Sequence, residues 1–132
     1  MKRGDDIWLL PCSQDEYSLL FKNLKIIKAG TRIATVKKSD FLPAHDLALS
    51  TLDGEASFPC TELYYDDAVA FLRRDNIIAP LDSPGWNLVS FMGVNLGFVK
   101  NLGKRLNNYF PVEWRIRMNV QSDSEKDLIK WE

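Results

Sequence analysis

The chain has 132 residues, 45% of them hydrophobic and 27% charged, and its formal net charge at pH 7 is −1. This balance is typical of a folded soluble protein of one domain, or of two small domains that share a core. No apolar run approaches the roughly 20 residues of a membrane-spanning helix, and Asp5 and Asp6 interrupt any signal-peptide core. We therefore expect a cytoplasmic protein with no membrane partner.

Few residues are suited to metal or redox chemistry. The two cysteines, Cys12 and Cys60, are expected to be reduced in a chain without a signal sequence. Neither a C-x-x-C motif nor a group of histidines and cysteines is present, so we expect no metal site. The single histidine, His45, is interpreted as a helix residue with satisfied hydrogen bonds, not as a ligand or a base.

The N-terminal part predicts three strands and one helix. A short apolar strand is expected at residues 7–10. Ser13 and Glu16 then have the spacing of a capping box, which predicts a helix over residues 14–24. A hairpin is expected to follow, formed by residues 25–29 and 32–37 with a turn at Gly30. One face of the helix is apolar; it carries Tyr17, Leu20, Phe21 and Leu24.

The middle of the chain predicts two helices separated by a loop and a strand. Pro43 suits the first turn of a helix, which we expect over residues 43–50. A loop at residues 52–60 and a strand at residues 61–65 come next. The second helix, residues 66–74, has acids in its first turn and arginines in its last, which complements the helix dipole. Its expected buried stripe is Ala68, Phe71 and Leu72.

The C-terminal part predicts a hairpin, a loop and a last strand. After a connector over residues 76–85, a two-residue period begins and predicts strands at 86–91 and 96–100. An irregular loop that includes Asn107 and Asn108 is expected to end at Pro111. A final strand, residues 113–118, would place Arg115 and Arg117 on one face, and a polar tail starts at residue 121. The core is expected to include Trp86 and Trp114.

These elements amount to about six short strands and three helices, which favours the α+β class. The expected architecture is a curved mixed sheet, or a partial barrel, covered by short helices. The alternation of strands and helices is too irregular for a doubly wound sheet, and no glycine-rich turn leads from a strand into a helix.

A local excess of positive charge points to nucleic acid. Residues 86–118 hold five Lys and Arg against one acid, whereas residues 41–85 hold two against eight. Lys and Arg neutralise phosphates, Asn offers hydrogen bonds to a base edge, and Tyr stacks on unpaired bases. The candidate RNA-binding residues are Lys100, Lys104, Arg105, Asn107, Asn108, Tyr109, Arg115 and Arg117.

Each of these residues also has a purely structural interpretation. The basic stretch can be a solvated charged face. Asn107 or Asn108 can occupy a left-handed turn, and Tyr109 can lie at the rim of the core. Arg115 and Arg117 can pair with the acidic segment 41–85. Charge alone does not choose between the two interpretations.

The order of the sequence motifs favours the RNA-binding interpretation over the structural one. Residues 93–100 are GVNLGFVK, residues 105–111 are RLNNYFP, and residues 114–117 are WRIR; residues 43–50 are PAHDLALS. These segments resemble the C-terminal region of bacterial RNA 5-methylcytosine methyltransferases of the Sun/RsmF type, with its G-x-P-L-G-x-x-K, R-x-x-N-x-Y-P and final basic strand. The resemblance covers about three quarters of the chain. Asn95 replaces the usual proline, and Phe110 is inserted before Pro111.

In that family a Rossmann-like catalytic domain is followed by a PUA-like RNA-binding region. The resemblance therefore implies an N-terminal α/β part, residues 1–55, and a PUA-like part, residues 56–132, in one compact unit. It also implies a non-catalytic module that positions structured RNA, in particular rRNA, for a methyltransferase domain in cis or in trans. The alternative is a protein-interaction or scaffold domain of the same fold that does not bind RNA.

Two Pro-Cys dipeptides imitate the catalytic motif of the family. They are Pro11-Cys12 and Pro59-Cys60. A nucleophilic thiol also needs a tuned environment, here a second thiol, an acid and a pocket for S-adenosylmethionine. Since no glycine-rich cofactor loop is present, we expect no catalytic residue and no cofactor in this chain. S-adenosylmethionine would enter only with an attached methyltransferase domain, and a stand-alone enzyme on this scaffold is the least favoured hypothesis.

Overall fold

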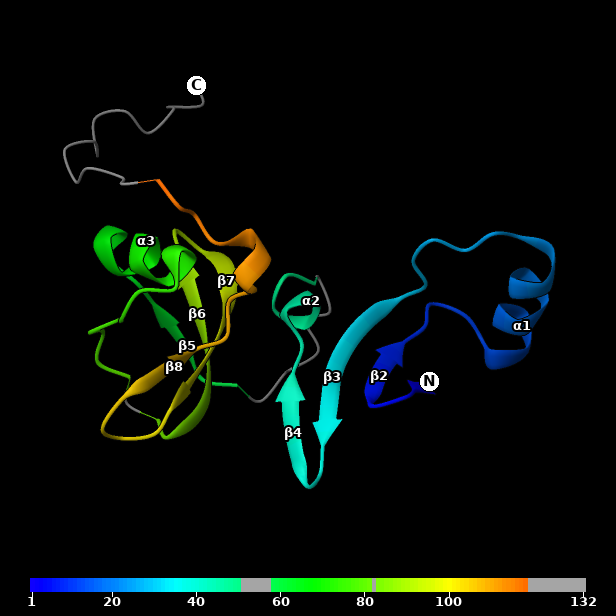
Figure 1. Cartoon of the computed structure of the whole chain (residues 1–132), viewed down its shortest axis with the longest axis horizontal. Helices are drawn as coiled ribbons and strands as arrows, with labels where there is room; N and C mark the ends of the chain where they lie inside the picture. The colour runs from blue at the N-terminus through cyan, green and yellow to red at the C-terminus, as the bar shows by residue number, and fades with distance from the viewer. Residues whose placement is uncertain (51–57, 82, 119–132) are drawn as a thin grey trace. The chain divides into compact units, whose positions relative to one another are not determined.

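The computed structural model describes residues 1–50, 58–81 and 83–118. The chain forms two compact units, Met1–Phe58 and Pro59–Glu132, each with its own four-stranded sheet and short helices (Figure 1). The fold is α+β, as the sequence predicts. In the described residues no helix is long and apolar enough to cross a membrane. The loop predicted at residues 52–60 lies mostly outside the described residues, and the polar tail lies there entirely.

The first unit contains an antiparallel sheet with the strand order β1-β2-β3-β4. Its strands are β1 (Lys2–Arg3), β2 (Asp6–Leu9), β3 (Thr31–Lys37) and β4 (Asp40–Pro43). The hairpin predicted from residues 25–29 and 32–37 is wrong, because residues 25–29 form no strand and β3 pairs with β2 and β4. Gly30 has a φ of +67°, and a Cβ there would collide with the Leu9 carbonyl. This close approach brings β3 alongside β2.

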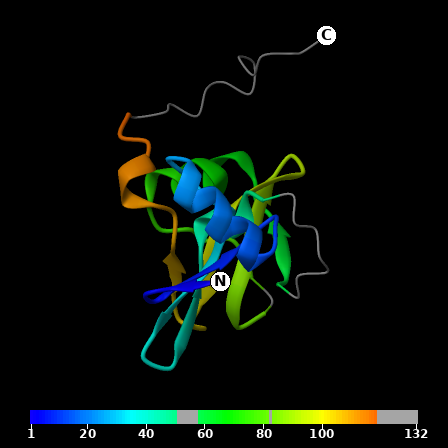
Figure 2. The same ribbon diagram turned by 90° about the vertical axis from the view of Figure 1, so that its right-hand side faces the viewer.

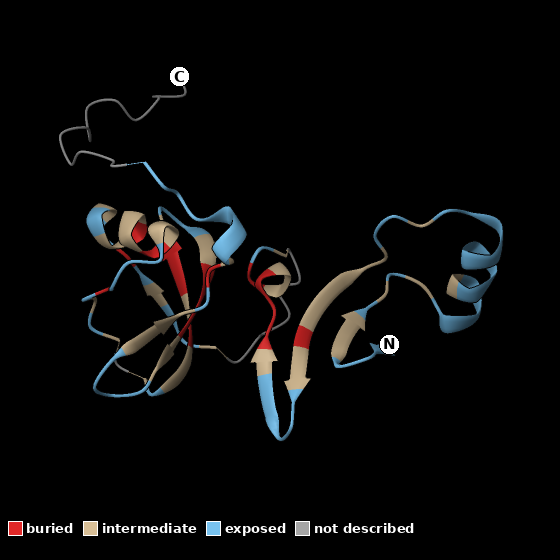
Figure 3. Cartoon of the chain, viewed as in Figure 1, coloured by how far each residue is buried: buried red, intermediate tan, exposed pale blue. Residues whose placement is uncertain are grey.

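Helix α1 (Gln14–Asn23) begins at the predicted capping box. The Ser13 backbone N–H donates to the Glu16 carboxylate at 2.8 Å, and the Glu16 N–H donates to the Ser13 hydroxyl at 3.3 Å. The hydrogen bonds from Ser13 lower the pKa of Glu16. The apolar face is also as predicted, but it is exposed: none of the ten residues of α1 is buried (Figure 3).

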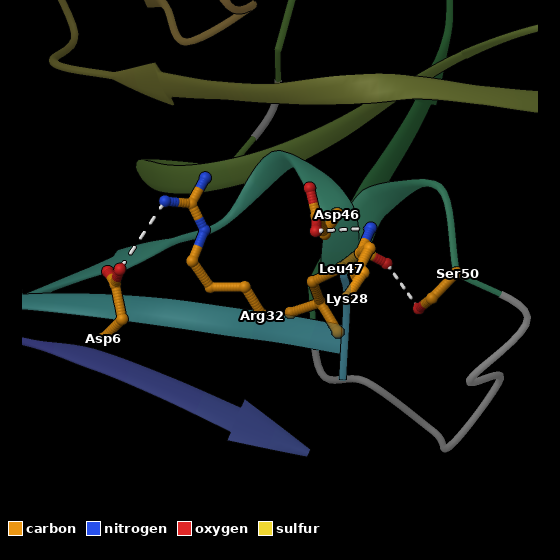
Figure 4. A network of polar contacts seen from close by, with 6 residues as sticks. All are labelled: Asp6, Lys28, Arg32, Asp46, Leu47 and Ser50. Carbon is orange, nitrogen blue, oxygen red and sulfur yellow. Dashed lines mark hydrogen bonds and ion pairs between the residues drawn. The ribbon is translucent and has the colours of Figure 1, made fainter. Parts of the chain in front are cut away.

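Helix α2 (His45–Ala48) is shorter than predicted. Pro43 belongs to β4, where it pairs with Ala34, so the helix cannot begin there. His45 is buried, and burial lowers the pKa of its imidazole, although the neighbouring Asp46 carboxylate acts in the opposite direction. Ion pairs connect the elements of this unit, with 3.1 Å between Lys28 and Asp46 and 3.8 Å between Arg32 and Asp6 (Figure 4).

The second unit contains a mixed sheet with the strand order β5-β6-β7-β8. Strand β5 (Cys60–Glu62) is parallel to β6 (Gly85–Phe91), which is antiparallel to β7 (Val94–Asn101), and β8 (Leu106–Asn108) forms the edge. Parallel neighbours need a crossover connection, and α3 (Tyr65–Arg73) lies in it. The predicted β6–β7 hairpin and the predicted second helix are both present; the strand predicted at residues 61–65 is shorter and ends at Glu62.

The core of this unit lies between α3 and one face of the sheet. Ala68 and Phe71 of the predicted stripe are buried, and Leu72 is partly buried. The rings of Phe71 and Phe110 pack edge-on with their centroids 5.5 Å apart. The buried cluster consists of Leu63, Ala68, Phe71, Ile77, Val89, Val99 and Phe110.

The C-terminal segment differs most from its prediction. Residues 113–118 form no strand; a 3₁₀ turn, η1 (Val112–Trp114), comes first. The chain then attaches to the helix by a 3.0 Å hydrogen bond from the Ile116 N–H to the Leu72 carbonyl. This segment therefore follows α3 and not the sheet (Figures 1 and 2). Trp114 is 58% exposed, so its assignment to the core is wrong.

Glu62 fastens the β6–β7 turn to the end of β5. Its carboxylate accepts hydrogen bonds from the Ser90 hydroxyl at 2.6 Å and from the Gly93 N–H at 3.2 Å. The Ser90 hydroxyl, together with the backbone N–H groups of Gly93 and Met92, lowers the pKa of Glu62. A carboxyl group with a lowered pKa in the folded state stabilises the fold above its unfolded pKa, and loses this contribution as the pH falls through the folded pKa.

We therefore predict that the free energy of unfolding of Glu62→Gln falls less steeply than that of the wild type as the pH is lowered below neutrality. Ser90→Ala removes the shortest of these hydrogen bonds, at 2.6 Å, and should act in the same direction. Urea denaturation at a series of pH values below neutrality measures the effect. A Glu62→Gln profile parallel to that of the wild type throughout the acid range would contradict the assignment.

Candidate nucleic-acid interface

Three neighbouring strands carry a row of side chains on the face of the sheet opposite the core. Trp86 pairs with Lys100, and Lys100 pairs with Asn107, so the three side chains share a face. The Lys100 ammonium lies 5.2 Å from the centroid of the Trp86 ring, and the Tyr109 ring lies 4.5 Å from it. We call Trp86, Lys100, Asn107 and Tyr109 the aromatic–basic face. It contains three of the eight predicted site residues.

Asn108 points to the other face of the same strand. Its side-chain N–H donates to the Phe71 carbonyl, and its side-chain oxygen accepts from the Phe110 N–H, both at 2.8 Å. Its amide is therefore engaged within the fold, while the side chain of Asn107 lies on the face that carries Lys100. Residues 106–108 were expected within an irregular loop, but they form the edge strand β8. Neither Asn107 nor Asn108 has a positive φ, so the interpretation of one of them as a left-handed turn residue is wrong.

A hollow of about 510 Å³ opens between β8 and the end of α3. We call it the Tyr109 hollow. One wall comes from β8 and the residues after it, and the other from the residues where α3 ends. Its lining residues are Arg74, Asp75, Asn76, Leu106, Asn107, Asn108, Tyr109, Phe110 and Pro111.

A second hollow, of about 290 Å³, is lined by Lys104 and Arg105 together with residues 77–81 of the connector. Leu106 lines both hollows, so the two are adjacent. Lys104 and Arg105 are exposed in the turn between β7 and β8. The structure thus brings six of the eight predicted residues to the β7–β8 edge of the sheet.

The remaining two, Arg115 and Arg117, do not belong to this group. Both are exposed and flank Ile116, whose backbone is attached to α3. The prediction that they share one strand face is wrong, because η1 and the contact with α3 replace that strand. Among the described residues neither guanidinium forms an ion pair, so the alternative in which they pair with the acidic segment 41–85 is not seen there.

Sequence reasoning missed two residues of this region. Arg74 caps α3 in a left-handed conformation with a φ of 63°, and its guanidinium donates to the Asn108 carbonyl at 3.1 Å. Trp86 was expected in the core, but it is half-buried and lies on the opposite face. The available signal for Arg74 was its position: it and Arg73 are the basic residues of the otherwise acidic segment 41–85.

The two cysteines are free thiols, one in each unit. Cys60 lies on β5 with its sulfur 3.5 Å from the Ser90 hydroxyl, which in turn donates to Glu62. Across the described parts of the chain, no three His, Cys, Asp or Glu side chains are grouped so that they could hold a metal ion.

The opposite orientation of the two asparagines gives a direct test. We predict that Asn108→Ala lowers the free energy of unfolding by about 1–3 kcal/mol, because it leaves the Phe71 carbonyl and the Phe110 N–H without these hydrogen bonds. Asn107→Ala is the matched control, and its change should stay within about 0.5 kcal/mol. Chemical denaturation compares the two. Equal destabilisation would show that the assigned orientations are incorrect.

Comparison with known proteins gives a family match for most of the second unit. Residues 58–116 match the family model of the methyltransferase RsmF PUA domain. The chain is 32% identical over 113 residues to the ribosomal RNA small subunit methyltransferase F of Shewanella loihica, which covers 84% of this chain and 22% of that protein. The Shewanella piezotolerans protein of the same name is 32% identical, with 83% and 22% covered. That of Klebsiella pneumoniae is 27% identical, with 85% and 22% covered.

The chain spans about a fifth of the length of these curated relatives, and the matched part is their C-terminal region. The resemblance predicted from the sequence is thereby confirmed. The PUA match begins at residue 58, at the boundary between the two compact units, and ends at residue 116, beside α3.

Proposed function

We propose that this chain, whose residues 58–116 match the RsmF PUA domain, is an RNA-binding module that holds structured RNA for a methyltransferase domain. The observation that carries the proposal is the grouping of Lys100, Lys104, Arg105, Asn107 and Tyr109 at one edge of the sheet. The names of the relatives make ribosomal RNA the first RNA to test.

The basic residues of this edge suit phosphate contacts. Lys104 and Arg105 are exposed, and they are the charged residues among the described lining of their hollow. Lysine and arginine that neutralise phosphates release counterions, which makes the affinity fall as the salt concentration rises. Arg115 and Arg117 form a second exposed basic pair beside α3, and we propose that they extend the phosphate contacts.

We propose no catalytic role and no cofactor for this chain. The sulfur of Cys60 is next to the Ser90 hydroxyl, and the carboxylate of Glu62 is occupied by Ser90 and by the β6–β7 turn. These contacts hold β5, β6 and the β6–β7 turn together, so Cys60, Ser90 and Glu62 have a structural role. Any S-adenosylmethionine would be bound by the attached or partner methyltransferase domain.

The phosphate contacts predict a defined loss of affinity. Lys104→Glu with Arg105→Glu should weaken binding to rRNA fragments and reduce the slope of log affinity against log salt by about 2, one for each lost contact. Fluorescence anisotropy at several KCl concentrations measures both quantities.

Lys2→Glu with Arg3→Glu is the matched control, since it reverses one exposed lysine and one exposed arginine in the first unit. This variant should keep the affinity and slope of the wild type. Binding of the wild type that does not depend on salt, or no binding at all, would refute the proposed function. Equal losses in both double variants would attribute the binding to net charge and not to this edge.

The proposed methyltransferase partner has a candidate contact surface on α1. The exposed apolar residues include Leu20 and Phe21 of the helix and Leu24 at its C-cap. Ile27, which follows the helix, is 97% exposed. Soluble proteins seldom expose contiguous apolar patches unless a partner covers them. In these relatives the matched segment makes up 22% of the protein, so most of each relative lies outside it. We therefore propose that the methyltransferase domain covers this face.

We predict that Leu20→Ser with Leu24→Ser weakens, by tenfold or more, the binding of this chain to the rest of the Shewanella loihica relative. Isothermal titration with that purified part measures the affinity. Tyr64→Ser with Ile78→Ser, two exposed apolar residues of the second unit, is the control and should have no effect. Self-association that the α1 variant abolishes would assign the face to a second copy of this chain instead.

A further inference from the structure

We infer that the Tyr109 hollow binds a single unpaired nucleotide of the RNA. This inference rests on the proposed function and names the part of the RNA that the site recognises. A volume of about 510 Å³ is within the range of small-ligand pockets, roughly 300–1,000 Å³. The hollow is therefore large enough for a base with its sugar.

The lining offers the groups that recognise a base. Tyr109 supplies an aromatic ring that is 37% exposed. Arg74, Asn76 and Asn107 also line the hollow; a guanidinium is planar, and an amide both donates and accepts hydrogen bonds. Unpaired bases are recognised by stacking on aromatic rings and by hydrogen bonds to their exposed edges. The lining contains both kinds of group within one concavity.

These groups are held in place before any ligand binds. Tyr109 is fixed by its contact with Trp86 at 4.5 Å, and its backbone N–H donates to the Phe98 carbonyl at 3.1 Å. Arg74 is fixed by its hydrogen bond to the Asn108 carbonyl, which uses one of the five N–H donors of the guanidinium. Pre-organised side chains lose little conformational entropy on binding.

The charge of the hollow also suits a nucleotide. Its one acid, Asp75, forms an ion pair with Arg73 at 3.0 Å. Of the charged residues in this lining, Arg74 is the one that has no ion pair with an opposite charge among the described residues. Lys104 and Arg105 lie across Leu106, in the adjacent hollow, where they are placed to contact the flanking phosphates.

A concave site of this kind discriminates against paired bases. In an A-form duplex the bases are stacked on their neighbours and their pairing edges are occupied, so neither face nor edge can enter the hollow. A bulged or looped-out nucleotide presents both. The site therefore adds recognition of an unpaired nucleotide to the phosphate contacts, which act on any RNA.

The test compares two RNA hairpins that differ by one bulged nucleotide. Tyr109→Ala should weaken binding of the bulged hairpin by about 5- to 150-fold, the range of stacking on one aromatic side chain, and should leave binding of the fully paired hairpin unchanged. Tyr109→Phe keeps the ring and should keep the affinity. Tyr64→Ala, which removes an exposed tyrosine at the other end of α3, is the control.

A second measurement does not depend on the folding of any variant. With 2-aminopurine as the bulged nucleotide, binding of the wild-type protein should change the fluorescence of that base as it stacks on Tyr109. Equal affinity for both hairpins, with both weakened by Lys104→Glu and Arg105→Glu, would overturn the nucleotide site and leave the proposed function standing. Absence of binding to either hairpin would overturn the proposed function, and the nucleotide site with it.

Discussion

The second unit depends on the side-chain amide of one edge-strand residue, Asn108. It donates to the Phe71 carbonyl near the end of α3 and accepts from the Phe110 N–H, while its backbone carbonyl accepts from Arg74. The sheet, the helix and the segment after the strand are thereby joined at one point. An amide is suited to this position because it can donate and accept at once, so two buried backbone groups are satisfied by one side chain.

The candidate site follows from this constraint. Because side chains alternate along a strand, fixing Asn108 toward the core places Asn107 on the opposite face, beside Lys100. The strand residue that serves the fold and the one that faces solvent are thus neighbours in the sequence. The same hydrogen bonds hold the end of α3 beside β8, and the Tyr109 hollow lies between these two elements.

Local charge matters more than the total in this protein. The net charge of −1 gives no indication of a nucleic-acid partner, yet the β7–β8 edge gathers Lys100, Lys104 and Arg105. Asp75, in the hollow beside this edge, forms an ion pair with Arg73. Glu62 lies on the opposite edge strand, β5, where it is engaged with the β6–β7 turn. Under the proposed function, a basic edge in a chain with almost no net charge would favour contact with RNA at one place and weaken non-specific attraction elsewhere.

The sequence by itself determined the features that depend on near neighbours: the capping box of α1, the β6–β7 hairpin and the acid-to-base order of α3. It also named Lys100, Asn107 and Tyr109, but not Arg74 or the position of Trp86. Only the tertiary structure decided the partners of β3, the strand at Leu106–Asn108 and the course of the chain after η1. These depend on contacts between distant residues, such as Asn108 with Phe71 and Ile116 with Leu72, which leave no periodic pattern in the sequence.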